Sequence, residues 1–424
     1  MAVMLLPIAL AGFLLLSPQD QVNFTGAGSC ASSNCHGSVW PRTGGRIKQN
    51  EYQIWSTKDG HAKAYAVLLE PRSQQIARNL GISEPHTATL CLDCHTTNAP
   101  QQRQARTFEI SDGVGCESCH GPASQWLGPH TTRDWTHQQS LSAGMNDTRD
   151  FDVRADTCLS CHLGNQEKTV NHQLIAAGHP DLVFELDTFS ALMPRHWDEP
   201  EGDWQGLRRW AIGQAVSLRE SMEQLAHRVE QPSWAGWPDF ADFECFACHH
   251  NLVLPSERQA RGYKGIAGIP PWNPSRYIVF RHAVTAISGG QRQQLEQLVE
   301  NLKQHLQQPA DNRLQIARTA RQLADLTDSL ISQWQAANLG EPMALQIMRA
   351  ISGDAQNIAQ SGIRSAEQAT MSVDALFRSW RENTGKTNEL LDAQIARLYE
   401  WLQSTSRYSP SEFATQLAKI QQVL

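Results

Sequence analysis

Residues 113–122 read Gly-Val-Gly-Cys-Glu-Ser-Cys-His-Gly-Pro, so two cysteines separated by two residues are followed directly by a histidine. The same Cys-x-x-Cys-His pattern recurs at residues 91–95, 158–162 and 245–249. A longer form, with four residues between the cysteines, occupies residues 30–36. These five motifs use all ten cysteines of the chain: Cys30, Cys35, Cys91, Cys94, Cys116, Cys119, Cys158, Cys161, Cys245 and Cys248.

Cys-x-x-Cys-His is the attachment signature of c-type haem. The two sulfurs form thioether bonds to the vinyl groups on one edge of a haem, which explains their short spacing. The adjacent histidine then binds the iron as the proximal ligand. The sequence therefore predicts five covalently attached haem c groups, with proximal ligands His36, His95, His120, His162 and His249.

Three other uses of paired cysteines fit less well. Zinc sites take two Cys-x-x-Cys pairs per metal and need no histidine after each pair. Redox dithiols use a single pair. A disulfide framework would not place a histidine after every second cysteine. The longer first motif is the weakest of the five taken alone, and its place in line with the others supports the haem interpretation.

Eleven histidines remain for the distal face of the haems, and ten of them precede residue 283. His61 has small neighbours that let a haem approach, and His130 follows shortly after the third motif. His172 and His179 flank a short apolar helical stretch, and His250 follows a proximal histidine directly. The six candidate distal ligands are His61, His130, His172, His179, His196 and His250.

Composition indicates a globular protein of two or three domains. The chain has 424 residues, of which 40% are hydrophobic and 19% charged, with a net charge of −7. This acidic balance makes nucleic acid an unexpected partner. Haem propionates would add negative charge, so a basic redox protein is the expected partner.

The N-terminal segment is apolar from Ala2 to Leu16, a length typical of the core of a signal peptide and short for a membrane span. No Lys or Arg precedes Arg42, so the usual basic start is absent. We expect residues 1–20 to be a signal peptide or an N-terminal anchor. The remainder of the chain is expected to be exported, in the periplasm.

The sequence predicts a mainly α fold in two parts. Residues 26–254 form a loop-rich pentahaem cytochrome c domain, small enough that the haems must pack against each other. Residues 255–276 are rich in Pro and Gly and predict a linker. Residues 277–424 predict an all-α helical bundle, either a cover for the haem stack or a docking and oligomerisation module. Helices are expected at 204–229, 277–288, 290–307, 311–338, 342–382, 385–405 and 410–422, with breaks at Gly353 and Gly362 in the fifth.

The order of these motifs resembles that of cytochrome c-554-type multihaem cytochromes, which are related to hydroxylamine oxidoreductase. The resemblance covers residues 26–200 and includes Gly113–Pro122 and Ala177-Gly-His-Pro180. It implies a periplasmic electron carrier with mostly bis-histidine haems. It also implies that His61 and His179 are distal ligands and makes His130 and His172 candidates. The fifth motif and the helical C-terminal part depart from the tetrahaem type member.

Two functions follow from these patterns. The first is a non-catalytic electron carrier with six-coordinate haems. The alternative is a haem enzyme of the hydroxylamine oxidoreductase or nitrite reductase type, with one open iron and no identified catalytic residue. The longer loop of the first motif makes its haem the expected place for unusual ligation. A third possibility is a structural subunit of a larger respiratory complex.

Overall fold

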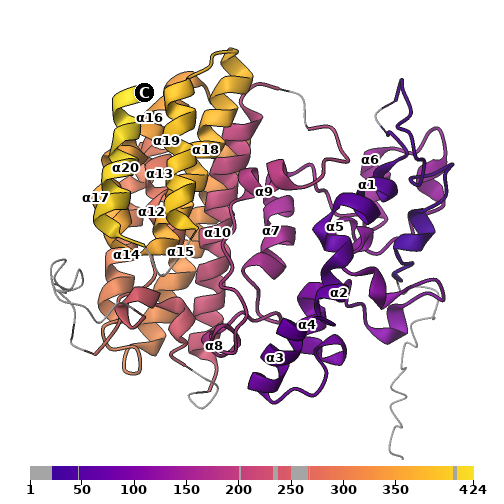
Figure 1. Cartoon of the computed structure of the whole chain (residues 1–424), viewed down its shortest axis with the longest axis horizontal. Coiled ribbons are helices and arrows are strands. Elements are labelled where there is room, and N and C mark those ends of the chain that lie inside the picture. Colours follow the sequence, from indigo (N-terminus) through magenta and orange to yellow (C-terminus); the bar gives the residue numbers. More distant parts are fainter. Residues whose placement is uncertain are drawn as a thin grey trace, which may run out of the picture.

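The computed structural model describes residues 22–45, 47–199, 202–232, 237–249, 266, 268–403 and 408–424. Among these residues the only β structure is two isolated bridges, Phe24 with Gln104 and Phe243 with Trp272. The predicted mainly α fold is therefore confirmed. The chain forms two regions side by side, with short helices and loops on one side and long packed helices on the other (Figure 1).

The first region holds short helical segments joined by loops. Its α-helices are α1 (Glu51–Lys58), α2 (Ala64–Val67), α3 (Pro71–Leu80), α4 (Thr89–His95), α5 (Cys116–His120), α6 (His137–Ser142), α7 (Phe151–His162), α8 (His172–Ala176) and α9 (Leu186–Leu192). Two of the helices end at a glycine with positive φ, α3 at Gly81 and α5 at Gly121.

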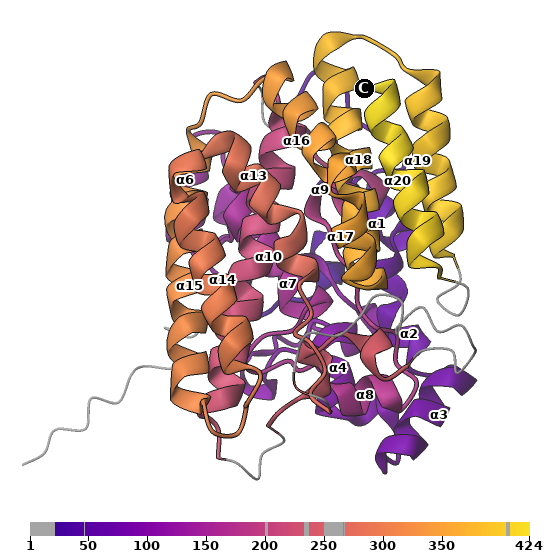
Figure 2. The same cartoon turned by 90° about the vertical axis from the view of Figure 1, so that its left-hand side faces the viewer.

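The second region is a bundle of longer helices (Figure 2). They are α10 (Gln205–Glu230), α12 (Ser275–Ile278), α13 (Phe280–Ile287), α14 (Arg292–His305), α15 (Arg313–Gln335), α16 (Glu341–Gly353), α17 (Ala355–Gln360), α18 (Ile363–Thr384), α19 (Glu389–Leu402) and α20 (Pro410–Val423).

Each helix expected from the sequence of the second region is present, and the expected breaks at Gly353 and Gly362 are confirmed. The segment expected at 277–288 divides into α12 and α13, and the segment expected at 342–382 divides into α16, α17 and α18. Gly362 separates α17 from α18 with φ +99°, a conformation that side chains rarely adopt. A Cβ atom there would also lie 2.5 Å from a carboxylate oxygen of Glu244. Glycine is therefore required at this break.

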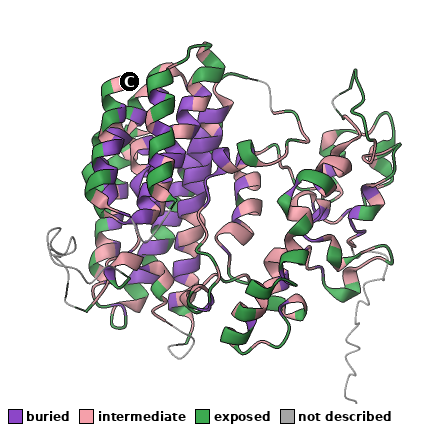
Figure 3. Ribbon diagram, in the orientation of Figure 1, coloured by how far each residue is buried: buried purple, intermediate pink, exposed green. Residues whose placement is uncertain are grey.

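The hydrophobic core belongs to the bundle. Its most deeply buried large side chains include Trp210, Phe280, Trp334 and Phe377, and Trp334 also donates to Ser288 Oγ at 2.8 Å. The core cluster begins at Phe151 and contains no residue before it. Residues 22–150 bury only scattered apolar side chains, as the predominance of exposed and half-buried positions there shows (Figure 3).

Helix α10 connects the two regions. It packs along α15 more extensively than any other pair of helices and also contacts α7, which carries the fourth motif. Although α10 precedes the fifth motif in the chain, its apolar side chains share the core of the bundle. The bridge between Phe243 and Trp272 likewise brings the last part of the expected linker next to the start of the fifth motif.

Two expectations fall partly on residues that are not described. The predicted N-terminal signal or anchor, residues 1–20, lies outside the described residues, and so does most of the expected linker, residues 255–276. Within the described ranges, no helix combines the length and apolar character needed to cross a bilayer.

Candidate functional site

The cysteine motifs lie on single helical turns. Three of them coincide with α4, with α5 and with the end of α7, and the fifth begins in the 3₁₀ turn Cys245–Ala247. Positions three apart on a helix share a face, so each turn presents its two sulfurs on one side. None of the ten cysteines forms a disulfide bond. This arrangement suits attachment of both sulfurs to one haem edge.

The longer first motif reaches a comparable geometry by adding a turn. Cys30 ends the 3₁₀ helix Ala27–Cys30, and Cys35 N–H donates to Ser32 O at 2.8 Å. The His36 amide then returns to Cys30 O at 3.2 Å. The extra residues loop outward, which leaves His36 next to the start of its motif.

Glu117, inside the third motif, ties the motif to distant parts of the chain. Its side chain is only 4% exposed, and its carboxylate accepts the backbone N–H groups of Thr25, Gly26 and Ala123 at 2.6–2.9 Å. A buried carboxylate is stable where several backbone donors satisfy it. Glu117 therefore fixes the third motif against the segment that leads into the first.

Cysteines from different motifs come together in two places. The thiols of Cys30 and Cys116 are neighbours, and their interaction lowers the pKa of Cys30. Cys161 has the same relation to Cys94, which lowers the pKa of Cys161 to about 5. The first motif thus adjoins the third, and the second adjoins the fourth. Cys119 and Cys158 are close enough to interact electrostatically, so the third motif also neighbours the fourth.

Four of the proximal candidates face a distal candidate. The centroids of the imidazole rings are 6.2 Å apart for His36 and His130 and for His61 and His162. They are 6.4 Å apart for His95 and His179 and for His172 and His249. Each pair joins segments that are distant in sequence.

This separation is the one expected for two imidazoles on opposite faces of one metal ion. A metal–imidazole bond is about 2.0 Å long and the ring centroid lies about 1.1 Å beyond the nitrogen, so the two centroids stand roughly 6.2 Å apart. Directly stacked rings would be much closer. The histidines present therefore fit the axial positions of haem iron.

The third proximal candidate, His120, has no ring contact of this kind among the described residues. Burial lowers its pKa to about 4, and of the neighbouring charges that of His196 contributes most. His196 is thus the nearest match among the distal candidates. Burial also lowers the pKa of His162 to about 4, with His61 as the contributing charge. Burial thus keeps both imidazoles neutral at pH 7, the form that binds a metal.

The ligand candidates are oriented through Nδ1. His95, His130 and His179 direct this atom to the carbonyl oxygens of Ala64, Trp126 and Pro180 at 2.8–2.9 Å. His36 and His61 direct it to the carboxylates of Glu51, at 2.9 Å, and Asp59, at 3.0 Å. Such bonds fix the tautomer and leave Nε2 for the metal.

Sequence reasoning missed the two carboxylates. Asp59 precedes His61 by two residues and also accepts its backbone N–H at 3.0 Å, a local pattern that is visible in the sequence. Glu51 lies fifteen residues from His36, and only the fold brings them together.

Two further histidines use Nε2 for other contacts. His227 Nε2 meets Gln231 at 3.2 Å, and His282 Nε2 meets Asp354 at 3.1 Å. Neither is arranged as an iron ligand. The candidate His250 lies outside the described residues.

One comparison with known proteins gives a match, and this match agrees with the candidate site. No curated protein matches the chain. No solved structure matches it either. The model of the family "Cytochrome c554 and c-prime" matches residues 29–121, which hold the first three motifs. This match supports a c-type cytochrome with covalently bound haem and electron transfer as its function.

Proposed function

We propose that this chain transfers electrons through five covalently bound haem c groups, each held by two histidines. The observation that carries the proposal is the set of four facing histidine pairs, with centroids 6.2–6.4 Å apart. The proposed axial pairs, in the order of the motifs, are His36–His130, His95–His179, His120–His196, His162–His61 and His249–His172. When bound, the haems supply the one-electron chemistry, and the chain holds and orients them.

The described part of residues 22–150 has no connected core of apolar side chains, and this supports the same proposal. A region of that length normally buries a connected cluster of apolar side chains. The described apolar core instead begins at Phe151. The porphyrins that this region would hold would supply the absent apolar contacts.

The spatial order of the haems follows from the cysteine contacts. Cys30 meets Cys116, Cys119 neighbours Cys158, and Cys161 meets Cys94. The second and fifth haems would be linked through α8, because His172 and His179 lie at or just beyond its two ends. We therefore propose a continuous path in the order first, third, fourth, second and fifth haem. Electrons would enter or leave at the first and fifth haems.

Export to the periplasm is part of this proposal and rests on the apolar segment Ala2–Leu16 and on the cytochrome match. A basic redox partner remains a prediction based on the net charge of −7. Oligomerisation through the C-terminal helices remains a prediction as well.

For the alternative function, a haem enzyme with one open iron, one haem is the best candidate for that iron. His36 of the first motif, the expected place of unusual ligation, faces His130. Among the described residues, His120 of the third motif has no histidine ring facing it at the same separation. An open iron would therefore belong to the third haem, and its substrates would be small nitrogen compounds.

The deciding measurement combines haem quantification with carbon monoxide binding. For the carrier, the alkaline pyridine spectrum should give five haems per chain, and carbon monoxide should leave the spectrum of the dithionite-reduced protein unchanged. A carbon monoxide response near one haem in five would favour the enzyme instead. Fewer than five haems would contradict the proposed count.

A ligand variant tests the pairing directly. In His130→Gly, the first haem should lose its distal ligand, so the reduced protein should bind carbon monoxide at one haem in five. The matched control is His227→Gly, because His227 Nε2 contacts Gln231 instead of facing a proximal histidine. If His130→Gly binds no carbon monoxide, the His36–His130 pair is wrong.

A further inference from the structure

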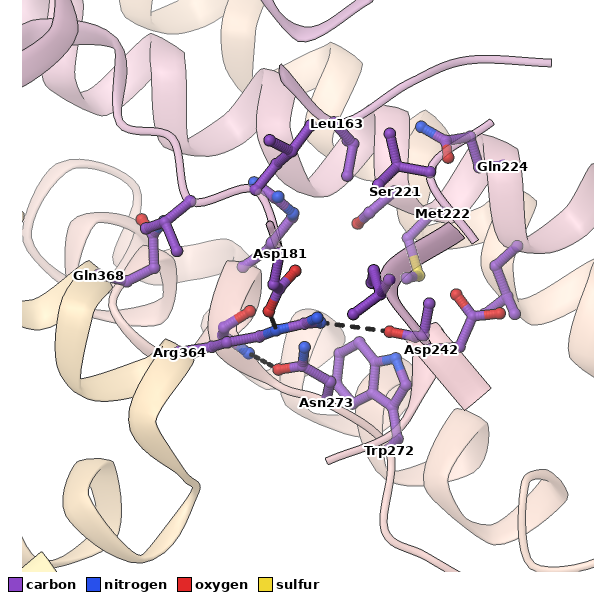
Figure 4. Close-up of a pocket in the computed structure, with 18 of the residues that line it drawn as sticks. Leu163, Asp181, Ser221, Met222, Gln224, Asp242, Trp272, Asn273, Arg364 and Gln368 are labelled. Carbon is purple, nitrogen blue, oxygen red and sulfur yellow. Dashed lines mark hydrogen bonds and ion pairs between the residues drawn. The ribbon is translucent and has the colours of Figure 1, made fainter. Parts of the chain in front are cut away.

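A hollow of about 830 Å³, including its open mouth, lies where the motif-bearing region meets the bundle (Figure 4). Its walls come from α10, α12 and α18 and from the segments around α8 and before the fifth motif. Among the described residues, no cysteine and no histidine lines it. The hollow is therefore separate from the faces on which the proposed iron ligands stand.

Charges in the hollow do not balance. Arg228 pairs with Asp242. Arg364 pairs with Asp181 (Figure 4). The third guanidinium that lines it, Arg276, donates to the neutral Ser217 Oγ at 2.6 Å.

Arg276 has no ion pair with a carboxylate among the described residues. Burial, and then the charge of Arg364, lower the pKa of Arg276 to about 10, so it stays protonated at pH 7. One positive charge in the hollow therefore lacks an anion.

A half-buried charge without a counter-ion is unfavourable, and a guanidinium is best satisfied by a planar carboxylate that accepts two hydrogen bonds. Three segments that line the hollow continue directly from proposed iron ligands. Leu163 follows His162, Ile175 lies one turn after His172, and Asp181 lies two residues after His179. The haems held there each carry two propionate carboxylates.

We propose that Arg276 binds a carboxylate in this hollow, and that a propionate of an adjacent haem supplies it. This inference rests on the proposed function, because it requires haem at the neighbouring motifs. The guanidinium then keeps the propionate ionised. It also raises the reduction potential of that haem, because a nearby positive charge disfavours the oxidised iron.

The experiment is a redox titration of the full-length holoprotein, followed at the absorption band of reduced haem c. In Arg276→Met, the midpoint potential of one haem should fall, and the other four should stay close to their wild-type values. The pH dependence of that midpoint should move to higher pH, because a propionate without its guanidinium protonates more readily. Arg276→Lys should restore most of the wild-type midpoint.

The matched control is Arg321→Met, which removes the same charge from the exposed face of α15, where Arg321 pairs with Glu223 and Glu230. It should change no midpoint. Should Arg276→Met fold poorly, Arg276→Gln removes the charge and keeps a polar group of similar length, and its midpoint should fall in the same way.

Added acetate and inorganic phosphate identify the source of the carboxylate. A haem propionate occupies the hollow permanently, so these anions should leave the wild-type midpoints unchanged. If the anions move a midpoint in the wild type and not in Arg276→Gln, Arg276 binds a free anion and the propionate assignment is wrong. Five haems with unchanged midpoints in every Arg276 variant overturn this inference alone. A chain without covalent haem overturns the proposed function as well.

Discussion

Glu117→Ala should strongly destabilise the motif-bearing region, lowering the free energy of unfolding by roughly 3 kcal/mol or more. The substitution leaves the backbone N–H groups of Thr25, Gly26 and Ala123 without their acceptor in a buried place. It also releases the third motif from the segment before the first. The measurement is chemical denaturation of the holoprotein followed by haem absorbance, in which the midpoint should move to lower denaturant.

Two variants calibrate this prediction. Glu117→Gln keeps one acceptor oxygen and should recover part of the loss. Glu109→Ala removes a nearby exposed carboxylate and should leave the midpoint unchanged. If Glu117→Ala denatures together with the wild type, the carboxylate does not hold the two segments in place.

Preventing haem attachment should have the largest effect of all, and it should divide the chain. Without haem, residues 22–150 have only scattered buried apolar side chains and should lose stable structure. The bundle has its own core and should keep its helices. Limited proteolysis with mass spectrometry should therefore cut the haem-free full chain within 22–150 and spare α12–α20.

A variant that loses only the fifth haem provides the control. In Cys245→Ser/Cys248→Ser, the other four haems remain, so residues 22–150 should stay as resistant to protease as in the wild type. If the haem-free chain resists protease equally over 22–150, haem does not supply the core of this region.

The sequence predicted the helices of the second region well because apolar side chains recur there with helical spacing. The expected break at Gly362 is present, but its close approach to Glu244 involves a segment more than a hundred residues away and depends on the fold. The break between α12 and α13 was not expected. Helix α10 was expected from its periodicity, but its packing along α15 depends on the tertiary fold.

The candidate iron ligands also fall into two groups: those that the sequence motif predicts and those that only the fold brings to a motif. Proximal histidines are adjacent to their cysteines, so a motif of five to seven residues identifies them. Distal histidines come from remote segments: His61 faces His162, and His130 faces His36. Sequence spacing provides no rule for such pairs. The sequence offered His196 only as one of six candidate distal ligands, and the structure places its charge near His120.

The sequence by itself determined the proposed chemistry, because thioether attachment and proximal ligation require residues that are neighbours in the chain. Only the tertiary structure decided which distal histidine faces which motif and which motifs adjoin. It alone also placed Arg276 in the hollow without a carboxylate partner among the described residues. These relations join groups brought together by packing, and burial then determines whether a charge needs a partner.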